Sequence, residues 1–275
     1  LEGFVMQKTN FAFEVLINDD ASTDNTADII REYEEKYHEI IKPVYQTENQ
    51  YSQRIPIIKT HLLPKANGEY FAWCEGDDYW TDPYKLQKQI DFLDNNPEYS
   101  ICVHTATVNN LKNDITYPCP DINESRDYTL EEIIIGDGGI FETCSLVMRR
   151  EVYTSKPSCF NARGFGDYQW YMYGAIYGKC RCLADNMAVY NLFTCGSWSS
   201  RTSENNENIL NYYKELSRML KNVNEYYDYK YHRVINRKVN SIEHIIYQQM
   251  IKVNSVVLNY LNLVYSNYEA KYQYL

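Results

Sequence analysis

The first 104 residues alternate short apolar runs with segments that carry apolar residues at helical spacing. The apolar runs have the length and composition of buried strands, and they lie at 13–17, 40–45, 70–74 and 100–104. The segments with helical spacing are 25–36, 57–63 and the stretch that opens at 82–83. This alternation predicts βαβ units, and therefore an α/β domain with a mostly parallel sheet flanked by helices.

The pattern changes in the second half of the chain. The elements predicted there are a helix at 129–135, a glycine-rich turn at 136–139, a strand at 145–148 and a helix that starts at Gly166. From about Glu204 the composition shifts to Asn, Tyr and aliphatic residues at helical spacing, exemplified by Ile209, Ile242 and Val257. We therefore predict an α/β domain over 1–203 and a helical extension over 204–275. The extension would be an appendage or an interface between copies of the chain.

The charge of the chain narrows the classes of partner. A formal net charge of -10 and a pI of about 5.1 argue against a nucleic-acid partner, because such binding draws on Lys and Arg that neutralise phosphates. An acidic protein that binds a diphosphate needs a local source of positive charge, and a metal ion supplies one. Eight cysteines without a paired CxxC pattern predict reduced thiols and a cytoplasmic protein.

Two acidic segments follow predicted strands. Asp19 and Asp20 end one strand, and Glu75, Asp77 and Asp78 follow another. In open α/β sheets ligands bind at the carboxyl ends of strands, and crowded carboxylates repel unless a cation lies between them. Hard oxygen ligands suit Mg²⁺ or Mn²⁺. The alternatives are turn and helix-capping chemistry for the first segment and a solvated acidic loop for the second.

The two segments also resemble a known family. Asn18 to Thr26 is similar to the DDxSTDxT segment of family-two glycosyltransferases, and Gly68 to Ala72 followed by Glu75-Gly76-Asp77-Asp78 resembles their GEYI strand and DxD-type motif. The stretch from Tyr79 to Gln89 is similar to a subset of bacterial members. The resemblance covers roughly residues 1–200 with order and spacing kept, and it implies a GT-A fold.

The resemblance also implies site roles and partners. Asp19 or Asp20 would bind the nucleotide base, and Glu75 and Asp77 would lie by the ribose and the metal. Asp78, with Asp77, would hold Mn²⁺ or Mg²⁺ against the diphosphate of a nucleotide sugar, with a UDP-sugar as the expected donor. The metal would stabilise negative charge as the nucleoside diphosphate departs. The acceptor would be a glycan or a lipid-linked sugar in cell-surface polysaccharide synthesis.

An inverting transfer also requires a base that takes the proton of the acceptor hydroxyl. The family places an acidic residue at a helix start downstream of the DxD motif, and Asp167 in Gly166-Asp167-Tyr168 matches that position. The alternative is that Asp167 only caps the helix. Glu142 is a second candidate for the base.

The chain departs from the family pattern in two places. The family begins with a strand of the form VSVIMPxYN before the residue that matches Leu1, so we expect a sheet without this inner strand. Many members carry a His late in the domain where this chain has Phe193, and phenylalanine cannot ligate a metal. Both departures leave open a catalytically inactive GT-A-like module. A nucleotidyltransferase is disfavoured, because the chain offers no glycine-rich triphosphate loop with a basic residue near its start.

Three further features have two interpretations each. The basic stretch 214–238 would either contact a membrane surface peripherally or form the solvated faces of packed helices. Trp80 and Trp170 would stack on a sugar or pack in the core. No apolar run of 18 residues is present, so a membrane-spanning helix is not expected.

Overall fold

The computed structural model describes residues 1–161, 166–203 and 206–251, and they divide into two compact units. The first unit comprises 1–133, 138–156 and 170–192, and the second comprises 134–137, 157–169 and 193–275. This division concerns packing. The domain boundary between residues 203 and 204 stays a prediction.

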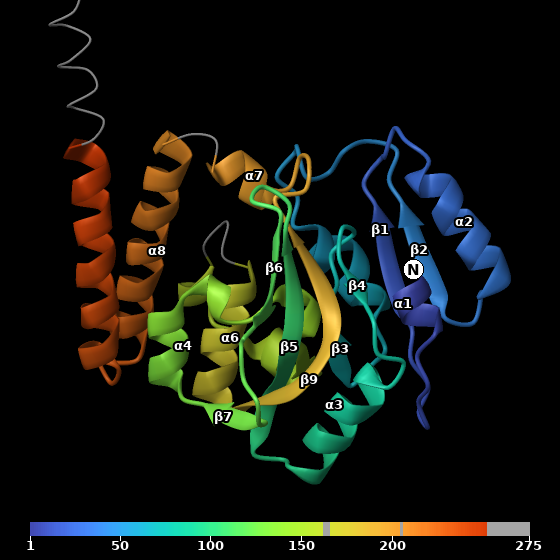
Figure 1. Ribbon diagram of the computed structural model, residues 1–275, viewed down its shortest axis with the longest axis horizontal. Coiled ribbons are helices and arrows are strands. Elements are labelled where there is room, and N and C mark those ends of the chain that lie inside the picture. The colour runs from blue at the N-terminus through green and yellow to red at the C-terminus, as the bar shows by residue number, and fades with distance from the viewer. Residues whose placement is uncertain (162–165, 204–205, 252–275) are drawn as a thin grey trace, which may run out of the picture. The chain divides into compact units, whose positions relative to one another are not determined.

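A small parallel sheet opens the first unit. Strands β1 (Val15–Asp19) and β2 (Ile41–Tyr45) pair in parallel, and helix α2 (Thr26–Lys36) connects them and runs beside them in Figure 1. Ile30 of α2 and Ile41 of β2 are buried. The βαβ unit that the hydrophobic pattern predicted is therefore confirmed. Strand β1 begins and ends two residues later than expected.

Seven strands form the larger sheet of the first unit. They are β3 (Tyr70–Ala72), β4 (Tyr79–Trp80), β5 (Tyr99–Asn110), β6 (Ile115–Cys119), β7 (Arg126–Tyr128), β8 (Val147–Arg149) and β9 (Lys179–Leu192). The main order is β3-β8-β5-β9-β4, with β6 beside β5 and β7 beside β9. Only β5 and β9 pair in parallel; the other pairs are antiparallel. The α/β fold with a mixed sheet is confirmed, although parallel pairs do not dominate this sheet.

The helices of the first unit include one clear difference from the predictions. Residues 57–63 are helical, as predicted, but they form a π-helix (Ile58–Leu62) followed by a 3-10 helix (Leu63–Lys65) rather than an α-helix. Pro64 explains this, because it has no N–H for a helical hydrogen bond and clashes with the preceding turn. Helix α3 (Lys85–Asn95) begins after Asp82, whose carboxylate accepts the N–H of Tyr84. The remaining short helices are α1 (Glu2–Val5), α5 (Arg150–Ser155) and two 3-10 turns (Gly138–Ile140 and Thr143–Ser145).

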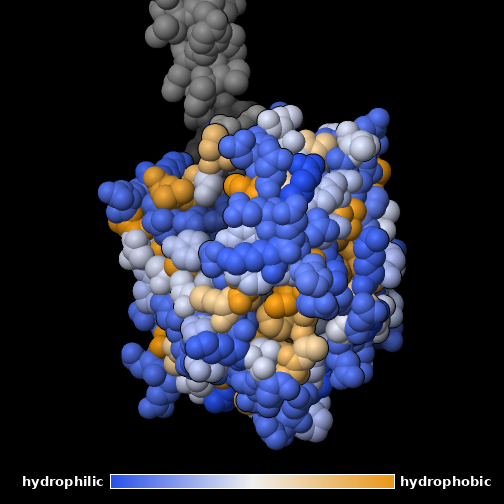
Figure 2. Space-filling view, turned by 90° about the vertical axis from the view of Figure 1, so that its right-hand side faces the viewer, coloured by the Kyte–Doolittle hydropathy of each residue, from blue (hydrophilic) through white to orange (hydrophobic). Residues whose placement is uncertain are grey.

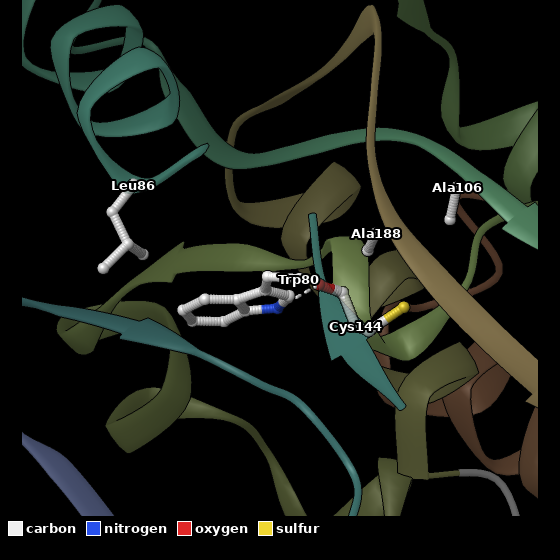
Figure 3. Close-up of a cluster of buried hydrophobic side chains, with 5 residues drawn as sticks. All are labelled: Trp80, Leu86, Ala106, Cys144 and Ala188. Atoms are coloured by element: carbon white, nitrogen blue, oxygen red, sulfur yellow. Dashed lines mark hydrogen bonds between the residues drawn. The ribbon is translucent and has the colours of Figure 1, made fainter. Parts of the chain in front are cut away.

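A buried cluster around Trp80 holds β4 in place. Figure 3 shows its indole between Leu86 and Cys144, with Ala106 and Ala188 completing the cluster. The indole Nε1–H donates to the carbonyl of Cys144 at 3.0 Å. Trp80 is thus a packing residue of the core, and its polar atom is satisfied.

Helix α1, near the amino terminus, packs against this cluster through Phe4. The ring of Phe4 meets the indole of Trp80 edge-on, with centroids 4.8 Å apart. Gly3 allows the close approach, because a Cβ there would lie 2.7 Å from the carbonyl oxygen of Trp80. The side chain of Gln7, just after α1, connects this part of the chain to the start of α3. It donates to the carbonyl of Asp82 and accepts the N–H of Leu86.

The second unit is built mainly from helices. It contains the end of α4 (Leu130–Gly136), the start of α6 (Gly166–Tyr177), a 3-10 turn (Ser158–Phe160), α7 (Trp198–Ser203), α8 (Asn206–Tyr226) and a helix over 232–251. In Figure 1, α8 and the helix that follows it run side by side. Their apolar faces are buried at Leu216, Leu220, Val223, Ile235, Val239 and Ile242. The predicted helical positions from Val257 onward lie outside the described residues.

Figure 2 views the face of the molecule on the side of α2. Hydrophilic residues cover most of this face, and apolar residues gather in its lower half. Within the described ranges, no helix combines the length and the apolarity needed to cross a bilayer. All eight cysteines are free thiols, as the sequence predicted.

Candidate functional site

The acidic loop, residues 75–78, lies between β3 and β4. Strand β3 ends at Ala72, and the N–H of Trp73 still donates to the carbonyl of Leu146 at 3.3 Å. The loop then turns, with the N–H of Asp78 donating to the carbonyl of Glu75 at 3.2 Å. Strand β4 follows at once and pairs with β9. The loop is therefore anchored at both ends to the larger sheet.

Three carboxylates meet in this loop. Glu75, Asp77 and Asp78 each bring an oxygen to within 4.8 Å of the others. Asp78 is buried, whereas Glu75 and Asp77 are exposed. Oxygens grouped in this way match the ligands that Mg²⁺ and Mn²⁺ prefer, with open positions left for water or phosphate.

Asp78 has an incomplete set of partners. One carboxylate oxygen, Oδ1, accepts the backbone N–H of Asn191 at 2.9 Å. The other, Oδ2, is buried and has no hydrogen-bond partner among the described residues. Burial raises the pKa of Asp78 to about 8, and the nearby charges of Asp77, Glu75 and Glu142 add to this, while the Asn191 N–H opposes it. A bound cation would satisfy the free oxygen and offset the repulsion, so the residues present fit a divalent metal.

Asn191 is the residue that sequence reasoning missed. Besides its N–H contact with Asp78, its side-chain amide donates to the carbonyl of Asp77 at 2.6 Å. Its own side-chain oxygen accepts from Asn109, which lies opposite it in the β5–β9 pairing. Asn191 thus fixes both ends of the Asp77–Asp78 peptide segment. It lies 113 residues from Asp78, and no local pattern in the chain indicates the contact.

The second acidic segment behaves differently. Asp20 lies just after β1, and its two carboxylate oxygens accept the N–H groups of Gln50 at 2.8 Å and Tyr51 at 2.9 Å. Its carbonyl accepts from the side chain of Asn49. The Asp20 carboxylate therefore organises the loop at 49–51. Neither Asp20 nor Asp19 belongs to the carboxylate group of the acidic loop.

Asp19 is the last residue of β1 and is 5% exposed. Its Oδ1 is buried without a hydrogen-bond partner among the described residues, while its backbone carbonyl accepts the N–H of Gln46 at 2.9 Å. Buried carboxylate oxygens are normally paired. Asp19 and Asp78 thus share one property, a buried carboxylate oxygen without a hydrogen-bond partner among the described residues. The sequence predicts a ligand-binding role for both residues.

The two candidates for the base lie in different units. Glu142, in the first unit, precedes the 3-10 turn at Thr143–Ser145, and its charge is near enough to raise the pKa of Asp78. Asp167, in the second unit, lies in the first turn of α6, where its Oδ1 accepts the N–H of Tyr168 at 2.7 Å. The contact joins neighbouring residues, so it is not the contact of an N-cap, whose side chain accepts an N–H two or three residues further on.

Phe193 follows β9 and belongs to the second unit. It has a left-handed backbone, with φ of 67°, and its N–H donates to the hydroxyl of Ser199 at 3.1 Å. A left-handed conformation is unfavourable for a bulky residue, so the neighbouring structure must hold it.

A buried polar network lies under the acidic loop. Lys85 is fully buried, its amino group donates to Gln89 at 2.8 Å, and it lies 4.2 Å from the ring centroid of Trp80. Gln89 in turn donates to the carbonyls of Cys102 and Ser145, both at 2.8 Å. Burial lowers the pKa of Lys85 to about 8. The network joins α3 to β5 and to the turn before β8, and it thereby supports the core beneath β4.

Trp170 also packs rather than standing alone. Its ring stacks on Tyr153 with centroids 4.4 Å apart and faces Trp73 at 6.4 Å. The amino group of Lys156 lies 4.8 Å from the Trp170 centroid. These contacts make an aromatic cluster at the end of β3, immediately before the acidic loop.

Comparison with known proteins agrees with this geometry. The model of the family described as "Glycosyl transferase family 2" matches residues 1–154. An uncharacterized protein of Mycobacterium tuberculosis (strain ATCC 25618 / H37Rv) is 36% identical over 208 residues, which are 73% of this chain and 56% of that protein. The chain thus spans about half the length of this relative.

Two further relatives carry names that state a chemistry. The putative teichuronic acid biosynthesis glycosyltransferase TuaG of Bacillus subtilis (strain 168) is 30% identical over 206 residues, 71% of this chain and 75% of that protein. The UDP-Glc:alpha-D-GlcNAc-diphosphoundecaprenol beta-1,3-glucosyltransferase WfaP of Escherichia coli is 33% identical over 89 residues, 32% of this chain and 33% of that protein.

The fold and site define an α/β protein of the GT-A type, with an acidic loop after strand β3 of the larger sheet. The family match covers more than half of the chain, and it includes both acidic segments. The chain belongs to glycosyl transferase family 2.

Proposed function

We propose that this chain is a metal-dependent, inverting glycosyltransferase. It transfers a sugar from a nucleotide-sugar donor, a UDP-sugar, to a glycan or lipid-linked acceptor in the synthesis of a cell-surface polysaccharide. The observation that carries the proposal is the acidic loop: three carboxylate oxygens within 4.8 Å of one another, one of them from a buried Asp78 with an unsatisfied oxygen. Family membership and the names of TuaG and WfaP support the substrate classes.

Each residue has a proposed role. Asp78 and Asp77 hold Mn²⁺ or Mg²⁺, and Glu75 lies beside them. When bound, the metal neutralises the charge that develops on the diphosphate as it leaves. Asp19 binds the nucleotide through its unsatisfied oxygen, and Asp20 contributes by ordering the loop at 49–51.

The transfer exchanges one bond for another. The acceptor oxygen forms a bond to the anomeric carbon while the bond from that carbon to the phosphate oxygen breaks. The nucleoside diphosphate leaves with the bonding electron pair, and the hydroxyl proton passes to the carboxylate of Asp167. Attack on the face opposite the leaving group inverts the configuration. Asp167 is preferred over Glu142 because the family resemblance places the base at a helix start downstream of the acidic loop, and Asp167 lies in the first turn of α6.

The test is a transfer assay on the purified chain with a panel of nucleotide sugars and lipid-linked acceptors. We expect product only with Mn²⁺ or Mg²⁺ present, and loss of product in chelator. Thermal-shift titration should show that UDP with Mn²⁺ stabilises the protein more than UDP alone, since ligands that bind the folded state raise its stability. Transfer that persists in chelator would contradict the metal assignment. Nucleotide binding without transfer would identify an inactive nucleotide-binding module.

Asp167→Asn separates the base from the donor site. The variant should bind UDP and Mn²⁺ as the parent chain does and should lose transfer by about 100-fold or more, because it cannot accept the proton. Glu142→Gln, assayed in parallel, should retain transfer. If Asp167→Asn transfers as fast as the parent and Glu142→Gln does not, the base is Glu142.

A further inference from the structure

One lysine of the helix over 232–251 is buried. Lys238 is 9% exposed, whereas Arg233 and Arg237 on the same helix are exposed. Lysine is rarely buried without partners, because removing an ammonium group from water is costly unless charges or hydrogen bonds replace the solvent. The contacts of Lys238 therefore identify the part of the second unit against which this helix packs.

Lys238 binds the carboxyl end of α4. Its ammonium group donates to the carbonyl of Ile135 at 3.1 Å and pairs with Asp137 at 2.8 Å. The last carbonyls of a helix have no partner within the helix and carry partial negative charge. Asp137, directly after α4, has a left-handed backbone with φ of 68°. A cation at this place thus satisfies a helix end and an adjacent carboxylate together.

The same helix end binds the start of α6. The hydroxyl of Tyr168 donates to the carbonyl of Ile134 at 2.8 Å, and the Tyr168 side chain is fully buried. The N–H of Tyr168 donates to the carboxylate of Asp167 at 2.7 Å. Two successive carbonyls, those of Ile134 and Ile135, therefore receive Tyr168 and Lys238. All of these groups belong to the second unit.

A residue of α8 is affected by the charges at the same place. Tyr212 of α8 is half-buried, and its pKa is raised by burial and by the negative charges of Asp137 and Asp167. Asp137 and Asp167 are thus both near α8.

We propose that Lys238 is a positioning residue for Asp167. By holding the carboxyl end of α4 through Ile135 and Asp137, it fixes the surface on which Tyr168, and hence the first turn of α6, rests. The helical region after residue 203 then does more than extend the chain: it sets the place of the proposed base within its unit. This inference rests on the proposed function, in which Asp167 accepts the proton.

The test compares Lys238→Met with Arg233→Met. Lys238→Met keeps the aliphatic stem and removes the ammonium group, and Arg233→Met removes an exposed charge from the same helix. We expect Lys238→Met to lower kcat about 10-fold, while KM for the donor changes less than twofold. Arg233→Met should change neither. The kcat is expressed per active molecule, with UDP-binding sites counted by calorimetric titration with UDP and Mn²⁺. Lys238→Arg, which keeps a cation, should recover most of the kcat.

A readout without catalysis accompanies the kinetics. Hydrogen–deuterium exchange of peptides over 166–172 should be at least fivefold faster in Lys238→Met than in Arg233→Met, with peptides of β5 unchanged. Tyr168→Phe should raise the same exchange and lower kcat, and the double variant Tyr168→Phe/Lys238→Met should be no worse than the poorer single one. Non-additivity is expected because both side chains act through the same helix end.

The outcomes are distinguishable. If the parent chain shows no transfer with any donor, the proposed function fails, and the exchange rates still decide whether Lys238 fixes the start of α6. If Asp167→Asn is inactive while Lys238→Met matches Arg233→Met in both kcat and exchange, the positioning role is overturned and the base assignment stands. If Lys238→Met does not fold, Lys238→Arg and Tyr168→Phe take its place, and normal kcat and exchange in Tyr168→Phe overturn the proposal.

Discussion

Two acidic segments follow strands of the first unit, and Asp20 in one and Asp78 in the other use their carboxylates in opposite ways. Asp20 has both carboxylate oxygens occupied by backbone N–H groups of Gln50 and Tyr51. Asp78 has one oxygen on the N–H of Asn191 and the other buried without a partner among the described residues. The first arrangement completes a loop of the protein. The second leaves a buried carboxylate oxygen that a bound cation would satisfy.

The supports under the two segments differ as well. The acidic loop is flanked by Cys74 and Trp80, which pack in a core cluster, and the amino group of Lys85 lies 4.2 Å from the ring centroid of Trp80. The segment after Asp20 is exposed, and Ala21 within it has a left-handed backbone with φ of 59°. Neighbouring Asp residues can thus serve local order or be available to a ligand. Burial and an unsatisfied oxygen mark Asp78, and likewise Asp19, whereas both carboxylate oxygens of Asp20 are bound within the protein.

The largest expected effect is on Asp78. Asp78→Asn should weaken the Mn²⁺-dependent binding of UDP on the order of 1,000-fold, about 4 kcal/mol, because a neutral amide cannot replace a charged ligand. Calorimetric titration with UDP and Mn²⁺ measures this. Asp24→Asn, in the other acidic segment, is the matched control and should bind within about threefold of the parent. Equal binding in the two variants would remove the distinction between the segments.

The next effect concerns the buried network under the acidic loop. The pKa of Lys85 is lowered to about 8 in the folded chain, against 10.5 for an ordinary lysine. Between these values the unfolded chain binds the proton more tightly, so stability rises with pH across that window. The free energy of unfolding of the parent, minus that of Lys85→Met, should therefore rise by about 3 kcal/mol from pH 8 to pH 10.5.

Urea unfolding at several pH values measures this difference. Lys59→Met, at an exposed lysine in the turn before β3, should show no such pH dependence relative to the parent. A flat difference between the parent and Lys85→Met would mean that the buried amino group keeps its proton throughout the window.

Asp20 should affect stability more than chemistry. Asp20→Asn places an amide NH₂ against one of the two backbone N–H groups, so the loop at 49–51 loses a charge-assisted hydrogen bond. We expect a loss of about 1 to 2 kcal/mol in the free energy of unfolding, measured in urea, because part of the interaction is exposed to water. Asp28→Asn removes a surface ion pair with Arg31 and should cost less than about 0.5 kcal/mol. A smaller loss for Asp20→Asn than for Asp28→Asn would show that the loop orders itself without this carboxylate.

The smallest effect is expected at Asn191. Asn191→Ala keeps the backbone N–H that binds Asp78 but loses the amide that holds the carbonyl of Asp77. Groups that orient metal ligands typically change metal affinity by about 10-fold to 100-fold, and we expect the lower value because one of the two contacts remains. The control is Asn186→Ala. Asn186 lies on β9, as Asn191 does, and its side chain contacts Thr107 of β5 rather than the acidic loop. Mn²⁺ titration should show no change in that variant.

Much of the fold could be predicted because its signals are local. The βαβ unit of β1, α2 and β2 follows from apolar periodicity, and α3 has the predicted apolar face at Leu86, Ile90 and Leu93. The predicted helix at 57–63 is present, but as a π-helix and a 3-10 helix rather than an α-helix, because Pro64 cannot complete the α-helical hydrogen bonds. The long strands β5 and β9 exceeded their predicted lengths or were not predicted, because their pairing across the sheet extends them.

The candidate site divides in the same way. The acidic loop was recognised because its carboxylates are neighbours in the chain and follow a strand. Asn191 was not recognised, because strand pairing brings it from 113 residues away. Lys238 was read as one charge in a basic stretch, and only packing shows that it is buried on the end of α4.

The sequence by itself determined the family, the order of the early elements and the place of the three carboxylates in the acidic loop. These depend on residue types and spacings within about ten residues, where backbone geometry limits the outcomes. Only the tertiary structure decided that Asp78 keeps an unsatisfied buried oxygen while Asp20 does not. Burial and hydrogen-bond satisfaction depend on which distant strand, loop or helix arrives beside a residue, and a single sequence does not record those contacts.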